Sequence, residues 1–135
     1  MGTIPLLVAA FGTVLALAGC VTSPKTQRVS FSELLENPER FDGARVALTA
    51  CAFNSMHGTV LLECGRNDSK PIALGIPPTD DPIYPIYDRF FGVRAQFSTP
   101  RVRADITGRY EWHSGQTPSR ILRLERVLGA HPYEP

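Results

Sequence analysis

The chain has 135 residues, and its 14 Lys and Arg stand against 13 Asp and Glu, which gives a formal net charge of +1. This near neutrality argues against a dedicated nucleic-acid or polyanion binder. The charges are unevenly placed, because arginines outnumber acids over residues 89–126 whereas residues 33–88 lean acidic. A solvated mixed-charge surface and a functional basic face are both consistent with this skew.

An apolar run occupies residues 4–18, which contain no charged side chain. Such a run is typical of the apolar core of a signal peptide, and it is shorter than the about 20 residues that a membrane-spanning helix needs. Small residues at Ala18 and Gly19 suit a peptidase cleft, and a polar stretch follows Cys20. The alternatives are an uncleaved membrane anchor and a buried core helix that ends in an ordinary cysteine.

Residues 17–20 (LAGC) resemble the lipobox of bacterial lipoproteins. The resemblance implies a signal peptide over residues 1–19 and a diacylglyceryl group on the sulfur of Cys20, which becomes the acylated amino terminus. Three chains of the palmitate type would anchor the protein firmly, since each buried methylene contributes about 0.8 kcal/mol. Val21 stands where the inner-membrane retention signal usually has Asp, so the resemblance favours the outer membrane, facing the periplasm.

Residues 20–28 are rich in Ser, Thr, Pro and Gln and predict a flexible tether. A short helix is expected next, because Ser30 and Glu33 have the spacing of a capping box. Its apolar stripe consists of Phe31, Leu34 and Leu35. Pro38 limits the helix, which we expect to end at Asn37 or to run one turn further.

Five strands are expected after this helix, at residues 45–53, 59–64, 71–76, 101–113 and 121–127. The fourth alternates polar and apolar residues over thirteen positions, which predicts a long strand with one buried face. An inserted residue near Ala50 would bring Cys51 and Phe53 onto the interior face of the first strand. The predicted domain covers residues 29–130, and we expect a frayed tail from Gly129, with residues 131–135 outside the domain.

Two further cysteines, Cys51 and Cys64, would meet an oxidising compartment after export, where thiols pair. If His57 and Gly58 form the tip of a hairpin, Cys51 lies opposite Cys64. A disulfide there would stabilise the fold by about 3 kcal/mol on the chain-entropy account. Free thiols, or a metal site that adds His57 or His113, are the alternatives, although no C-x-x-C or H-x-x-x-H spacing is present.

Residues 77–87 carry four of the twelve prolines. Two acids and two tyrosines in and around this loop form a candidate contact surface, made of Asp80, Asp81, Tyr84 and Tyr87. Prolines reduce the entropy lost when a loop holds one shape. An ordered connector whose tyrosines cover the core is the alternative interpretation.

Residues 32–46 and 106–111 resemble small exported bacterial proteins with a five-stranded, OB-fold-like barrel. In those proteins a leading helix ends in Asn-Pro-x-x-Phe/Tyr-Asp-Gly-Lys/Arg-Val and a later strand carries Thr-Gly-x-Phe/Tyr. The resemblance implies a mainly β fold and transfers no active site. The usual OB ligand face, on the second and third strands, lacks aromatic and basic residues here, while Tyr110 and Trp112 are expected in the core.

We expect a lipid-anchored, non-catalytic binding or adapter module that uses no cofactor or metal. Its expected partners are the membrane, through Cys20, and another envelope protein, through the barrel or the proline-rich loop. The alternatives are a small envelope enzyme and an oligonucleotide- or oligosaccharide-binding domain. No nucleophile elbow, phosphate loop or HExxH motif is present, and the side chains of His57, His113 and His131 have plain surface interpretations.

Overall fold

The computed structural model describes residues 2–3, 25–66 and 68–134. The expected signal peptide and Cys20 therefore lie outside the described residues. Within the described ranges, no helix has both the length and the apolar character to span a membrane.

The described residues form short helices around one sheet. In chain order the elements are β1 (Gln27–Arg28), α1 (Phe31–Glu36), α2 (Pro38–Phe41), β2 (Arg45–Ser55), β3 (Gly58–Leu62), β4 (Ile72–Gly75), α3 (Tyr84–Phe91), α4 (Ala95–Ser98), β5 (Arg101–Trp112) and β6 (Arg120–Pro132).

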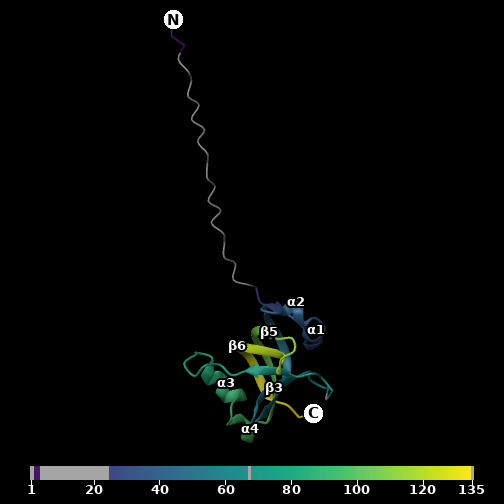
Figure 1. The fold of residues 1–135 in the computed structure, drawn as a ribbon. Helices are drawn as coiled ribbons and strands as arrows, with labels where there is room; N and C mark the ends of the chain where they lie inside the picture. Colours follow the sequence, from purple (N-terminus) through teal and green to yellow (C-terminus); the bar gives the residue numbers. More distant parts are fainter. Residues whose placement is uncertain (1, 4–24, 67, 135) are drawn as a thin grey trace.

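The sheet closes into a barrel in the order β2, β3, β4, β6, β5 and back to β2 (Figure 1). The β4 and β6 strands pair in parallel, and the other four pairings around the barrel are antiparallel. Closure gives each of the five strands a paired neighbour on both sides over part of its length. This arrangement confirms the expected mainly β, OB-fold-like barrel.

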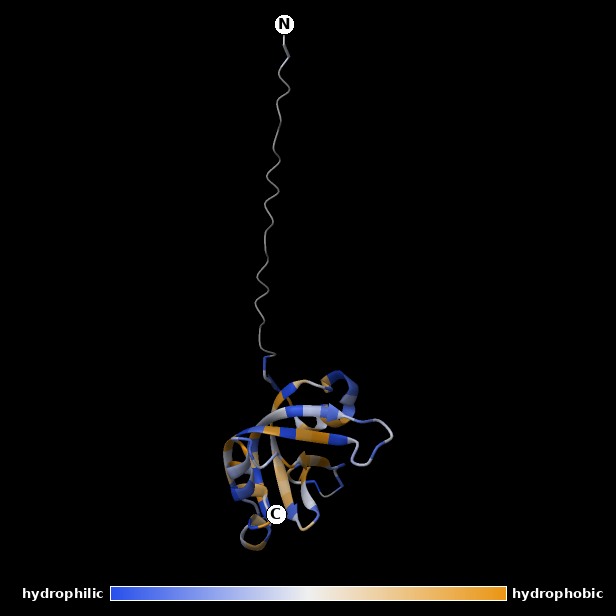
Figure 2. Ribbon diagram, turned by 60° about the vertical axis from the view of Figure 1, so that its left-hand side comes forward, coloured by the Kyte–Doolittle hydropathy of each residue, from blue (hydrophilic) through white to orange (hydrophobic). Residues whose placement is uncertain are grey.

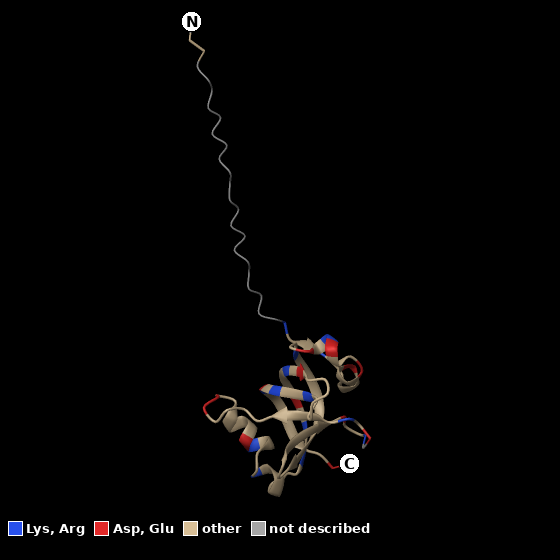
Figure 3. Cartoon of the chain, in the orientation of Figure 1, with Lys and Arg blue, Asp and Glu red and all other residues tan. Residues whose placement is uncertain are grey.

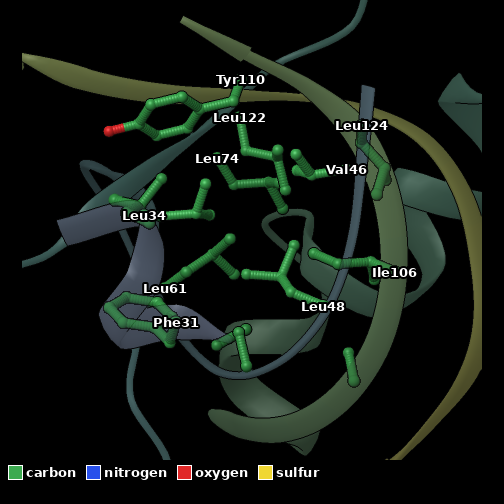
Figure 4. Packing of buried hydrophobic residues seen from close by; sticks show 14 of the residues in the cluster. Phe31, Leu34, Val46, Leu48, Leu61, Leu74, Ile106, Tyr110, Leu122 and Leu124 are labelled. Carbon is green, nitrogen blue, oxygen red and sulfur yellow. The ribbon is translucent and has the colours of Figure 1, made fainter. Parts of the chain in front are cut away.

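Large aliphatic side chains from every barrel strand meet inside the barrel (Figure 4). Leu34 from α1 and Tyr110 from β5 are both 0% exposed, and they close the core at the end where α1 and α2 lie. On the other side of the core, α3 contributes Tyr87 and Phe91. The barrel and its helices therefore share one hydrophobic core.

The α1 helix begins as its sequence predicts. The Ser30 backbone N–H donates to Glu33 Oε2 at 2.9 Å, and the Glu33 backbone N–H donates to Ser30 Oγ at 3.1 Å. This reciprocal pair satisfies two backbone donors that a helix start otherwise leaves open. The helix ends at Glu36, and α2 continues the chain from Pro38.

The alternation predicted for the fourth strand is confirmed in β5 for Val102, Ala104, Ile106 and Tyr110, which are buried. It is interrupted at Thr107, an odd-numbered residue that is buried as well. The register of β5 against β6 shifts twice, at Asp105/Ile106 and Thr107/Gly108. At the second shift a Cβ on Gly108 would lie 2.4 Å from the Arg123 carbonyl oxygen. Only glycine lets the two strands approach this closely where the barrel bends.

The bulge expected near Ala50 is wrong. The β2 strand pairs with β5 in one unbroken register, from Arg45 opposite Arg109 to Phe53 opposite Arg101. Regular alternation therefore leaves the Phe53 side chain on the outer face, where it is 39% exposed. Irregularity occurs in the β5–β6 pair instead, because β6 supplies the extra residues.

The Cys51–Cys64 disulfide is confirmed, with the two Cα atoms 5.0 Å apart. The register that led to it is wrong by two residues, since Cys51 pairs with Leu62. The hairpin turn lies at Met56 and His57, one residue earlier than expected. Cys64 follows the end of β3 and reaches back to Cys51 from outside the ladder.

Three further differences concern the connections and the ends. Part of the expected tether, Gln27–Arg28, pairs in parallel with β2 as β1. The frayed tail expected from Gly129 is wrong, because β6 pairs with β5 as far as Pro132, opposite Val102. The connector after β4, expected to be irregular, contains the helices α3 and α4.

Candidate functional site

The proline-rich segment does not bring its four candidate residues together as one exposed surface. Tyr87 is 5% exposed and belongs to the core, and desolvation by this burial raises the pKa of its hydroxyl. The Tyr84 ring packs with its centroid 6.3 Å from that of Tyr87. Asp81 Oδ1 accepts a 2.9 Å hydrogen bond from the Ile83 backbone N–H, and Asp80 is exposed. These positions match those of an ordered connector.

The two ends of the barrel carry different surfaces. We call the end beside β1, α1 and α2 the proximal end, and the end at the β2–β3 turn and α4 the distal end (Figure 1). The eleven residues of β2 connect them and span about 33 Å at the usual rise per residue. Three large apolar side chains at the distal end are strongly exposed, namely Met56 at 80%, Val93 at 66% and Phe97 at 80%.

A buried polar network holds α3 and α4 against the hairpin at the distal end. Asn54 Nδ2 donates to the carbonyl oxygens of Phe90 at 3.2 Å and Thr99 at 3.0 Å. Thr59 Oγ1 donates to the Phe91 carbonyl at 2.7 Å. The carbonyl groups in the last turn of α3 have no hydrogen-bond donor within the helix, and side chains from the strands supply the missing donors. The exposed apolar residues are therefore presented on a fixed backbone.

A second candidate site lies on the outer face of the barrel, over the disulfide. We call it the disulfide pocket, and it encloses about 300 Å³. It is formed by β2, the end of β3 and the segment after it, the first residue of β5 and the segment after β6. Its lining residues are Cys51, Ala52, Phe53, Leu62, Glu63, Gly65, Arg66, Arg101 and Tyr133.

Two arginines and two aromatic rings give the disulfide pocket its chemical character. The Arg101 guanidinium lies 5.6 Å from the centre of the Phe53 ring, within the range of a cation–π contact. The Tyr133 backbone N–H donates to the Arg101 carbonyl at 3.1 Å, which holds the segment after β6 beside the pocket. Arg66 Nη1 lies 3.7 Å from Glu63 Oε2. Arg101 has no ion pair among the described residues.

Charges of both signs are interspersed on the outer face of β5 and β6 (Figure 3). Arg45 Nε lies 2.8 Å from Glu125 Oε2 across this face. Glu111 accepts a 2.9 Å hydrogen bond from Arg123 Nε and lies 3.0 Å from His113 Nε2. Hydrogen bonding from Arg123, and then from His113, lowers the pKa of the Glu111 carboxyl. The skew toward arginine in the sequence therefore appears here as a mixed-charge surface.

The usual OB ligand face offers little functional chemistry in this barrel. Outward positions on β3 and β4 hold Val60, Leu62, Ala73 and Gly75, without an aromatic ring or a charge. The Arg123 side chain lies over Gly75, where an added Cβ would come within 2.9 Å of its Nη1. The two remaining histidines outside the Glu111 contact, His57 and His131, lie exposed at the hairpin turn and near the end of β6.

The disulfide removes Cys51 and Cys64 from the list of thiolate metal ligands. No group of three metal-ligating side chains occurs in the part of the chain that the structure describes. Sequence reasoning did not select Phe53, Arg66, Arg101 or Tyr133 as a site. The sequence did give one indication of this site. Phe53 occupies a position in β2 that the alternation assigns to the outward, polar face.

No protein-family model matches the chain, and neither a curated protein nor a solved structure is similar enough to it to count as a match.

Proposed function

We propose that this chain is a lipid-anchored protein of the bacterial cell envelope that acts as a non-catalytic binding or adapter module. The lipobox resemblance at residues 17–20 supports the anchor on Cys20, and Val21 supports the outer membrane facing the periplasm. The observation that carries the adapter role is the exposure of Met56, Val93 and Phe97 at the distal end.

The geometry suits a module that reaches from a membrane toward a partner. The chain joins the barrel at β1, on the proximal end, so a tether from Cys20 would leave the distal end facing away from the bilayer (Figure 2). Exposed apolar side chains on a rigid backbone are typical of protein contacts. The partner would be an envelope protein with a complementary apolar surface.

Site-specific photocrosslinking in intact cells tests this function. A photoreactive residue at Met56 should give one defined product with an envelope protein. The same residue at Glu36, which is exposed on the proximal end, should not. A second change, Phe97→Asp, should remove the Met56 product while the thermal unfolding midpoint stays unchanged, because Phe97 is 80% exposed.

Two outcomes would contradict the adapter role. One is the absence of a defined product from Met56, Val93 and Phe97 alike. The other is a product whose yield is the same from Glu36, or is insensitive to Phe97→Asp, since a contact unrelated to the distal end would produce that pattern.

A further inference from the structure

We propose that the disulfide pocket binds a small carboxylate that is attached to an aromatic or branched apolar group. The shared chemistry is met by a free organic acid or by the carboxyl-terminal residue of a peptide. The site lies on the outer face of β2 and β5 and adjoins the end of β3 at Leu62, so it shares only this residue with the usual OB ligand face on β3 and β4. It requires neither the lipid anchor nor the distal end.

Arg101 indicates that the ligand carries an anionic group. The Arg101 guanidinium carbon lies 5.6 Å from the centre of the Phe53 ring, and this cation–π contact holds the group beside the pocket. A planar guanidinium in a fixed orientation matches a carboxylate with two parallel hydrogen bonds. The pocket thus holds an arginine that is already positioned and has no acid partner among the described residues.

The single charge of the ligand follows from the balance of charges in the pocket. Two arginines and one acid line it, and Glu63 lies 3.7 Å from Arg66. One positive charge is therefore left for the ligand, which favours a monoanion over a phosphate, whose charge at neutral pH is between about −1.5 and −2.

The apolar half of the ligand follows from the rest of the lining. Phe53, Tyr133 and Leu62 offer apolar surface around the disulfide. A volume of about 300 Å³ is at the lower limit for small-molecule sites. It suits one side chain with its carboxylate, and longer ligands would extend into solvent.

The Cys51–Cys64 bond fixes the shape of the pocket. It ties β2 to the segment after β3, and that segment carries Glu63, Gly65 and Arg66. Without this bond the segment that carries Arg66 would be joined to the Phe53 side only through the β2–β3 ladder, which ends at Cys51 opposite Leu62. Binding should therefore require the oxidised form.

Amide chemical-shift titration of the ¹⁵N-labelled full chain in detergent tests the proposal. N-acetylphenylalanine should shift pocket amides, whereas N-acetylphenylalanine amide and inorganic phosphate should not. Arg101→Ala should weaken binding about tenfold or more, because it removes a charge-assisted contact. The matched control is Arg103→Ala, which removes the next outward arginine of the same strand but does not line the pocket.

A second ligand distinguishes a free organic acid from the carboxyl-terminal residue of a peptide. If acetyl-Ala-Ala-Phe binds more tightly than N-acetylphenylalanine, a peptide carboxyl terminus is the preferred form, and equal affinity indicates a free acid. Absence of shifts at the pocket with every acid would overturn the proposal. So would equal binding of the amide or of phosphate, or equal losses from Arg101→Ala and Arg103→Ala. None of these results bears on the crosslinks expected from the distal end.

Discussion

The two ends of this barrel use large apolar side chains in opposite ways. At the proximal end Leu34 of α1 and Tyr110 of β5 are completely buried. At the distal end Met56, Val93 and Phe97 extend into solvent, although a polar network holds the backbone around them in place. One end thus completes the core, and the other exposes apolar surface that the fold does not need. Stability and function are therefore expected to separate along the length of the barrel.

The largest expected effect tests this separation directly. Tyr110→Ala at the proximal end should lower the free energy of unfolding by about 4 kcal/mol, because it empties a fully enclosed site. Its counterpart at the distal end, Phe97→Ala, should change that free energy by less than about 0.5 kcal/mol. Urea titration followed by the fluorescence of Trp112 measures both. Similar losses from the two variants would break the comparison.

The disulfide gives the next largest effect. Replacing both Cys51 and Cys64 by Ser should lower the free energy of unfolding by about 3 kcal/mol, since the bond closes a loop with a sequence separation of 13. Thermal and urea unfolding with and without a reductant measure it. The double variant should no longer respond to the reductant, and an unchanged stability would contradict the chain-entropy account, in which the bond restricts the unfolded chain.

Disruption of the polar network at the distal end is expected to lower the free energy of unfolding by a smaller amount. Asn54→Ala leaves the carbonyls of Phe90 and Thr99 without this donor and should cost about 2 kcal/mol. Hydrogen exchange should become faster in α3 and α4, while α1 keeps its protection. Uniformly faster exchange at both ends would mean that the network supports the whole barrel rather than the distal backbone.

The smallest effect concerns charge on the outer face. Because hydrogen bonds lower the pKa of Glu111 in the folded state, its ionised form stabilises the fold above the ordinary carboxyl pKa range. That contribution is lost as the pH falls through the lowered pKa. Glu111→Gln should therefore cost about 0.5 kcal/mol at pH 7 and nothing in strong acid. Urea unfolding between pH 7 and pH 2 checks this, and a constant difference would contradict it.

Local signals predicted the proximal end well. The capping box at Ser30 and Glu33 depends on residues three positions apart, and the alternation of β5 depends on neighbours two apart. Both patterns follow from local backbone geometry, so they are recognised without knowledge of distant contacts. The barrel followed from the order of the elements and from the resemblance.

Prediction failed where a feature depends on a single residue or on distant contacts. The hairpin turn lies at Met56 and His57, and this small displacement moved the register of Cys51 by two residues. The α3 helix was missed because its prolines suggested a loop, yet Pro85 occupies the first turn, where no N–H is needed. Tyr84, Tyr87 and Phe91 are separated by three and four positions. This spacing is helical, and it predicts the face of α3 that packs on the core.

The disulfide pocket was beyond the reach of local reasoning. Phe53, Arg66, Arg101 and Tyr133 come from four separate segments, and only the closed barrel brings them together. The same is true of the distal surface, because exposure of Phe97 depends on how α4 lies against β2. A sequence pattern states which face a residue occupies, but it does not state which distant residues share that face.

The anchor is the premise of the orientation proposed for the two ends, and intact-mass analysis of the protein isolated from membranes tests it most directly. We predict a chain that begins at Cys20 and carries the added mass of a diacylglyceryl group and an amide-linked acyl chain. A chain that retains residues 1–19 and carries no fatty acid would contradict the account.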